Sequence, residues 1–131
     1  MKLNHDCIRS LLLVLEDSLQ YSENLELPTL SLNDILHDKR LQKFSKQDIV
    51  YSSEMLAEAD YINASVVKSD YAVLKVVYSG ITFKGHEYIN SIRDNNVWDS
   101  VIEKLGGNVT MATFDVIKEV SLFVIRKFIG M

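Results

Sequence analysis

The side chains best suited to metal binding or thiol chemistry in this sequence are three histidines and one cysteine: His5, His37, His86 and Cys7. His5 and Cys7 are two residues apart in a segment with helical spacing, so their side chains point in roughly opposed directions and cannot ligate one ion together. A zinc site would need His86 from a distant part of the chain. Cys7 falls on an apolar stripe, where a buried and inert thiol is usual. We therefore predict no metal site and no cysteine nucleophile.

Two other patterns resemble catalytic or cofactor motifs only in part. His86 and Glu87 begin like a zinc-protease motif, but Asn90 stands where the second histidine is needed. The Gly106-Gly107 pair lacks the following Lys-Ser/Thr of a phosphate loop and predicts the end of a helix instead. We expect no catalytic residues, no cofactor and no small-molecule substrate, and hence a protein that is not an enzyme.

A basic cluster is the best candidate for contact with phosphate groups. It has four cations within eight residues: Lys39, Arg40, Lys43 and Lys46. Gln47 and Tyr51 follow it and could contact DNA beside it. The alternative is a solvated connector whose charges are balanced by neighbouring carboxylates, and this is the commoner case for so short a run.

The segment after this cluster argues against insertion into a DNA groove. Helical spacing over residues 45–60 turns five residues outward: Gln47, Tyr51, Glu54, Met55 and Glu58. The conventional groove contacts are Gln47, Tyr51, Ser52 and Ser53, while the segment as a whole carries one lysine against four carboxylates. The full chain also has a formal net charge of −4. Both charge balances disfavour nucleic acid as the partner.

The elements that must position these residues follow from hydrophobic spacing and cap residues. Residues 3–19 predict a core helix capped by Asn4, and residues 20–29 a loop with a short extended stretch. Ser31 and Ser45 each predict the start of a helix, with Asp48 completing a pattern that resembles a capping box at Ser45. Residues 61–83 predict a two- or three-stranded antiparallel sheet with a hairpin tip at residues 68–70.

Two further helices are predicted after the strands, over residues 84–105, with an irregularity at 94–96, and over residues 109–129. The last helix is apolar on more than one side, which indicates either a central position or a homodimer contact, and we favour the homodimer. Its candidate interface residues are Phe114, Val116, Phe123 and Ile129.

Arg93 and Trp98 are a second candidate interface, because arginine and tryptophan are enriched in binding hot spots. The competing interpretation makes Trp98 a core residue and pairs Arg93 with a nearby carboxylate such as Glu87 or Asp94. This structural interpretation is the commoner one.

Length and composition favour a single helix-rich domain. The chain has 131 residues, of which 47% are hydrophobic and 24% charged, with a single proline. The most apolar windows are bounded by charged residues, so no membrane span is expected. With one cysteine and no signal-peptide pattern, we expect a cytoplasmic location.

Three blocks carry a resemblance to a known family: MKLNHDCIRSLLLVLED, VYSSEMLAEADYI and ITFKGHEYINSIRDNNVW. They resemble a family of small proteins of unknown function found in bacteria, phages and prophages, over most of residues 1–98, and TFKGHEYINSIRD is the most specific part. The resemblance implies a winged-helix-like fold and brings no catalytic residues. Winged-helix proteins usually have glycine at the end of the second short helix, where this chain has Asp60.

We therefore expect an α+β, winged-helix-like domain, with a helix-turn-helix and small antiparallel wing in residues 1–83 and a helical extension in residues 84–131. The favoured function is a bacterial or phage accessory protein that binds another protein, and the family association suggests modulation of host regulation or defence. The alternative is a DNA-binding transcriptional regulator that uses residues 45–60, the basic cluster and the wing.

Overall fold

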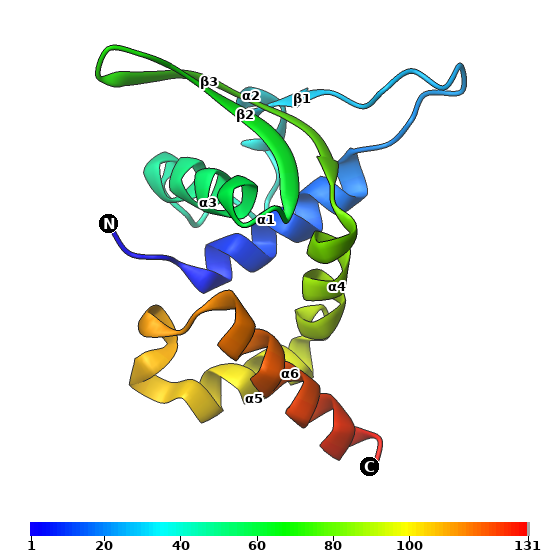
Figure 1. Ribbon diagram of the computed structural model, residues 1–131, viewed down its shortest axis with the longest axis vertical. Coiled ribbons are helices and arrows are strands. Elements are labelled where there is room, and N and C mark those ends of the chain that lie inside the picture. The colour runs from blue at the N-terminus through cyan, green and yellow to red at the C-terminus, as the bar shows by residue number, and fades with distance from the viewer. Residues whose placement is uncertain (131) are drawn as a thin grey trace.

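The computed structural model describes residues 1–130, in which the first helix lies at the centre (Figure 1). This helix, α1 (His5–Ser18), begins at Asn4, whose side-chain oxygen accepts the backbone N–H of Cys7 at 3.1 Å, as predicted. Its inward side is apolar, and the helix packs against α3 (Lys46–Glu58) and α4 (Phe83–Ile92). The fully buried residues on this side include Ile8, Leu11, Leu12 and Leu15. The amphipathic pattern thus makes α1 the helix on which the other elements pack.

The two short helices after the loop begin at the predicted serines. Ser31 caps α2 (Leu32–Ile35) in a reciprocal capping box, with Ser31 N–H donating to Asp34 at 2.8 Å and Asp34 N–H donating back at 3.3 Å. Ser45 caps α3 by accepting the backbone N–H of Asp48 at 3.0 Å, and only this half of the pattern forms. The capping box therefore lies at Ser31, one helix earlier than predicted.

The sheet has three antiparallel strands in the order β1-β3-β2. The two-residue β1 (Leu30–Ser31) pairs with the middle of β3 (Ala72–Ile81), and β2 (Ile62–Ser69) pairs with β3 along its length. The hairpin turns at residues 70–71, and Asp70 has φ 51°, so the tip lies slightly after the predicted position. Towards its tip the hairpin extends away from the helices (Figure 1).

A tight joint connects α3, the sheet and α4. Asp60 ends α3 at φ 62°, in the left-handed conformation expected of a residue that replaces glycine. Thr82 caps α4 by accepting the backbone N–H of Gly85 at 3.0 Å, and its hydroxyl donates to the Asp60 carbonyl at 2.5 Å. A Cβ at Gly85 would collide with the Tyr61 carbonyl oxygen. Gly85 is therefore needed for close approach between two backbones and not for a turn.

The helical region after the sheet differs from the prediction of two helices. The expected helix over residues 84–105 is two helices, α4 and α5 (Asn95–Leu105), because Asp94 accepts the N–H groups of Asn96 and Val97 and starts a new helix at the predicted irregularity. The guanidinium of Arg9 accommodates the break by donating to the carbonyls of Ile92 at 2.8 Å and Arg93 at 2.7 Å.

The last helix is also shorter than predicted. Residues 106–111 form the 3₁₀ helix η1 (Gly106–Met111), and α6 (Phe114–Phe128) begins only at its cap residue Thr113. The fold is thus helix-dominated α+β with a small three-stranded antiparallel sheet. None of the helices described within residues 1–130 is long and apolar enough to cross a membrane.

Candidate functional site

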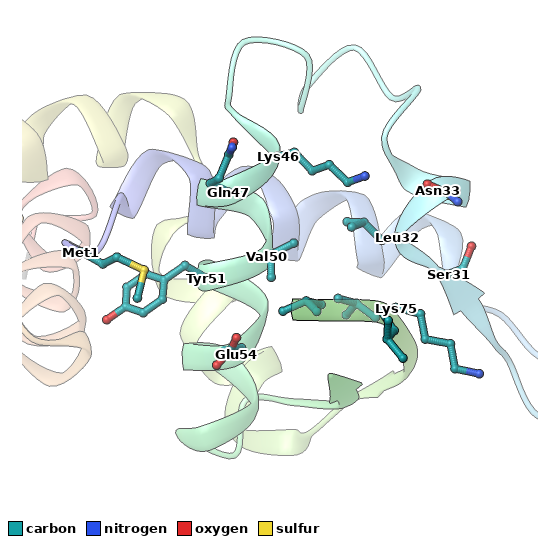
Figure 2. A pocket seen from close by; sticks show the side chains of 13 residues that line it. Met1, Ser31, Leu32, Asn33, Lys46, Gln47, Val50, Tyr51, Glu54 and Lys75 are labelled. Atoms are coloured by element: carbon teal, nitrogen blue, oxygen red, sulfur yellow. The ribbon is translucent and has the colours of Figure 1, made fainter. Parts of the chain in front are cut away.

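A groove of about 510 Å³ lies between α3 and β3, and we call it the α3–β3 groove. Figure 2 shows its side chains arriving from several segments far apart in the sequence. The lining residues are Met1, Ser31, Leu32, Asn33, Lys46, Gln47, Val50, Tyr51, Glu54, Val73, Leu74, Lys75 and Val76. The groove therefore combines the exposed side of α3, the start of α2 and one half of the hairpin.

The apolar part of the groove continues the hydrophobic core to the surface. Leu32 and Val76 are buried, while Val50 is partly buried and packs against the core. Beyond them, Val73 is 41% exposed and Leu74 is 64% exposed. Exposed aliphatic side chains beside a groove are typical of a surface that another molecule covers.

The polar part of the groove leaves two cations available. Glu54 is paired with Lys68 at 3.2 Å, so its charge is already balanced within the hairpin region. Lys46 and Lys75 are exposed and form no ion pair with any other residue in the described part of the chain. Two residues that line the groove, Lys46 on α3 and Lys75 on β3, thus carry a positive charge without an ion-pair partner in the described chain.

The predicted basic cluster does not form one surface. Lys46 lines the α3–β3 groove, whereas Arg40 donates to Asp38 at 2.9 Å and to Asp17 at 2.7 Å. The Arg40 guanidinium lowers the pKa of the Asp38 carboxyl.

The other two cations of the cluster have different surroundings. Lys43 sits over the Phe44 ring and lines a separate hollow beside Arg9 and Asp99, and Lys39 is exposed. Lys46, Arg40 and Lys43 thus have three different sets of neighbours, so these three cations do not form one continuous basic surface.

The four residues of α3 that were predicted to contact a DNA groove also have different environments. Gln47 and Tyr51 line the α3–β3 groove, as their outward positions predicted. Ser52 and Ser53 are buried, so they cannot contact DNA. The Ser53 hydroxyl donates to the Ile49 carbonyl at 2.8 Å and pairs with the Tyr78 hydroxyl at 2.7 Å. Ser53 therefore ties α3 to β3.

The soft ligands lie apart from one another. His5 is buried, and its Nε2 is 3.0 Å from the Ala112 carbonyl oxygen, which therefore accepts its proton. Cys7 is buried as predicted, and burial raises the pKa of its thiol. His86 lies 3.9 Å from a Glu16 carboxylate oxygen. Within residues 1–130, no group of three or more histidine, cysteine or carboxylate side chains is placed to hold a metal ion.

Arg93 and Trp98 serve the internal packing of the protein. Trp98 is 5% exposed, and its indole N–H donates to Asp6 at 2.8 Å, so it is not available as an exposed interface residue. Arg93 pairs with Glu16 on α1, at 2.6 Å, and not with Glu87 or Asp94. The Arg93 guanidinium lowers the pKa of the Glu16 carboxyl.

The four candidate interface residues of the last helix have different environments. Phe114 is partly buried in an aromatic cluster with Tyr61 and Tyr88, which removes it from the candidate interface. Val116, Phe123 and Ile129 are exposed by 41%, 47% and 63%, and they stay candidates.

Several groove residues were missed by sequence reasoning. Val73 and Leu74 lie near the hairpin tip, and the alternation over residues 72–78 was apolar on both sides. Because a sheet with one solvent face alternates apolar and polar residues, this excess of apolar side chains was the available signal.

Comparison with known proteins places the chain in a family. A family model described as "Hypothetical protein (DUF2513)" matches residues 2–109. An "Uncharacterized protein" of Haemophilus influenzae strain Rd is 27% identical over 130 residues, which cover 99% of this chain and 100% of that protein. No solved structure matches the chain. The chain belongs to the DUF2513 family.

Proposed function

We propose that this protein is a non-enzymatic protein-binding module built on a winged-helix scaffold. The order helix, strand, helix, helix, strand, strand supports this scaffold, with the hairpin of β2 and β3 as the wing after the helix-turn-helix of α2 and α3. The short β1 beside β3 completes the small sheet.

The observation that carries the proposed binding function is the α3–β3 groove. Its aliphatic side chains continue from the core to the exposed Leu74, and its two free cations, Lys46 and Lys75, lie on α3 and on the hairpin. We assign to it a segment of a partner protein that combines apolar anchors with at least one carboxylate. The apolar anchors would supply most of the affinity, and the carboxylate would fix the orientation.

DNA binding is the second candidate, because Lys46, Gln47 and Tyr51 lie on the exposed side of α3 and Lys75 lines the same groove from the wing. Two features weigh against it. The cations of the basic cluster point to different parts of the surface, and Glu58 and Asp60 are exposed near the end of α3. A phosphate backbone along α3 would meet these carboxylates.

A library of random twelve-residue peptides displayed on phage tests the groove. We expect enrichment of peptides with apolar and acidic residues, whose affinity falls at least tenfold for Leu74→Arg. The matched control is Leu25→Arg, the same change at a residue 79% exposed in the loop before β1. Failure to enrich peptides, or equal affinity for wild type and Leu74→Arg, would count against the groove.

An electrophoretic shift with a random 20-base-pair duplex at low salt tests the second candidate. We expect no retardation at tens of micromolar protein. Retardation that disappears in Lys46→Ala/Lys75→Ala would favour the DNA-binding function over ours.

The sequence-based expectations for biological context remain part of this proposal. We propose a cytoplasmic accessory protein of a bacterium or phage that modulates host regulation or defence. We also propose that it forms a homodimer through α6. The support for the homodimer is the exposure of Val116 and Phe123 on this helix.

A further inference from the structure

One side of α6 has an apolar stripe that is partly exposed at the surface. Val116, Val120 and Phe123 fall within an arc of about 60° at 100° per residue. Val120 is partly buried, while Phe123 is 47% exposed. The neighbouring arc, about 100° further round the helix, holds Ile117, Ser121 and Val124, which are buried in the protein.

Two residues of opposite charge are placed symmetrically about Phe123 in the sequence of α6. Glu119 is four residues before Phe123 and Lys127 is four residues after it, so both lie near the stripe. They are eight residues apart, or about 12 Å along the helix, which is too far for an ion pair within one copy. Neither forms an ion pair with any residue between 1 and 130, whereas the neighbouring Lys118 pairs with Glu87.

The surroundings of Phe123 are positively charged, and a carboxylate from another molecule would balance this charge. The ammonium groups of Lys104 and Lys127 lie 5.2 Å and 4.8 Å from the centre of its ring. Both cations lie close to the ring, and no carboxylate of the described chain pairs with either.

We infer that α6 pairs with α6 of a second copy in antiparallel orientation, with the two-fold axis at Phe123. In this arrangement Glu119 of each copy lies opposite Lys127 of the other, and the two Phe123 rings meet at the centre. A parallel arrangement would place each charge beside its own kind. The inference rests on the homodimer proposed above and specifies its geometry.

The stripe covers only about two turns of helix, so the contact is smaller than the standard interface of about 800 Å² per partner. We therefore expect a reversible dimer, with a dissociation constant high enough that the dimer is populated only in concentrated protein. This is the range accessible to sedimentation equilibrium between about 10 and 500 µM.

Charge reversal tests the geometry on the full chain. Sedimentation equilibrium should give at least tenfold weaker dimerisation for Phe123→Asp, and several-fold weaker for Glu119→Lys or Lys127→Glu alone. The double variant Glu119→Lys/Lys127→Glu should return to within about threefold of wild type, because the pairs across the two-fold axis are restored. Leu122→Asp, at a residue 37% exposed outside the stripe, is the matched control and should dimerise like wild type.

Two results would overturn different parts of this account. If the wild-type protein is monomeric up to 500 µM, the proposed homodimer is wrong, and so is this geometry. A wild-type dimer that is unaffected by Phe123→Asp, or that the double variant does not restore, keeps the homodimer and overturns the antiparallel contact at Phe123. Circular dichroism of each variant confirms that the helices are intact.

Discussion

Tyr78 and Tyr88 are both fully buried phenols, but their hydroxyl groups have opposite hydrogen-bonding situations. The Tyr78 hydroxyl pairs with Ser53, whereas the Tyr88 hydroxyl has no partner among the described residues. Burial raises the pKa of Tyr78 to about 12, and it raises the pKa of Tyr88 as well. Both therefore stay neutral, and the difference between them is one hydrogen bond.

Replacing each tyrosine by phenylalanine should change stability in opposite directions. Tyr78→Phe loses a buried hydrogen bond and should lower the free energy of unfolding by about 1 kcal/mol. Tyr88→Phe removes a hydroxyl that is buried without a partner, so it should be neutral or stabilising by about 1 kcal/mol. Urea unfolding of both variants measures the difference, and equal losses would contradict the hydrogen-bond assignment.

His5 should make stability depend on pH. Its Nε2–H donates to the Ala112 carbonyl, while its Nδ1 is buried without a partner, so a second proton has no acceptor. Burial lowers the pKa of His5 below its ordinary value of 6.5. The neutral ring thus stabilises the fold fully above pH 6.5, and this contribution is lost progressively as the pH falls below 6.5 towards the lower folded-state pKa.

The test compares His5→Gln, whose amide can still donate to Ala112, with wild type. The free energy of unfolding should fall more steeply between pH 7 and pH 5 in wild type than in this variant. Identical slopes in the two proteins would show that His5 does not titrate differently on folding.

At the scale of elements, cap residues and hydrophobic spacing predicted where most helices begin. Asn4, Ser31 and Ser45 each cap a helix as expected, because their short side chains reach a backbone N–H within the next turn. The break between α4 and α5 was anticipated only as an irregularity. Asp94 starts the new helix locally, whereas the carbonyls left at the end of α4 are bonded by Arg9, which lies more than eighty residues away and is invisible to local pattern.

The joint between the sheet and α4 leads to an element-scale prediction. Gly85→Ala should destabilise the protein by about 2–3 kcal/mol, because a Cβ there meets the rigid Tyr61 carbonyl and α4 must shift. Gly107→Ala is the matched control, since a Cβ at Gly107 meets nothing within 4 Å, and should change stability by less than about 0.5 kcal/mol. Thermal or urea unfolding compares them, and similar losses would refute the close-approach role of Gly85.

At the scale of the whole molecule, the α3–β3 groove exists only because four segments meet: the N-terminus, residues 31–33, α3 and β3. Gln47 and Tyr51 were predictable, since helical spacing alone places them outward. Met1, Asn33 and Leu74 were not, because their contribution depends on where α2 and the hairpin pack. The same packing sends Arg40 towards Asp17 and divides the basic cluster, which no charge count along the sequence could reveal.

The most direct test of the central claim is to map where a bound peptide lies on the folded protein. Amide chemical shifts of labelled protein, titrated with a peptide enriched from the display library, should change at residues 31–33, 46–54 and 73–76. The same peptide should cause no such changes in Leu74→Arg. Shifts confined to α6, or absent from these three segments, would contradict the assignment of the α3–β3 groove as the protein-binding site.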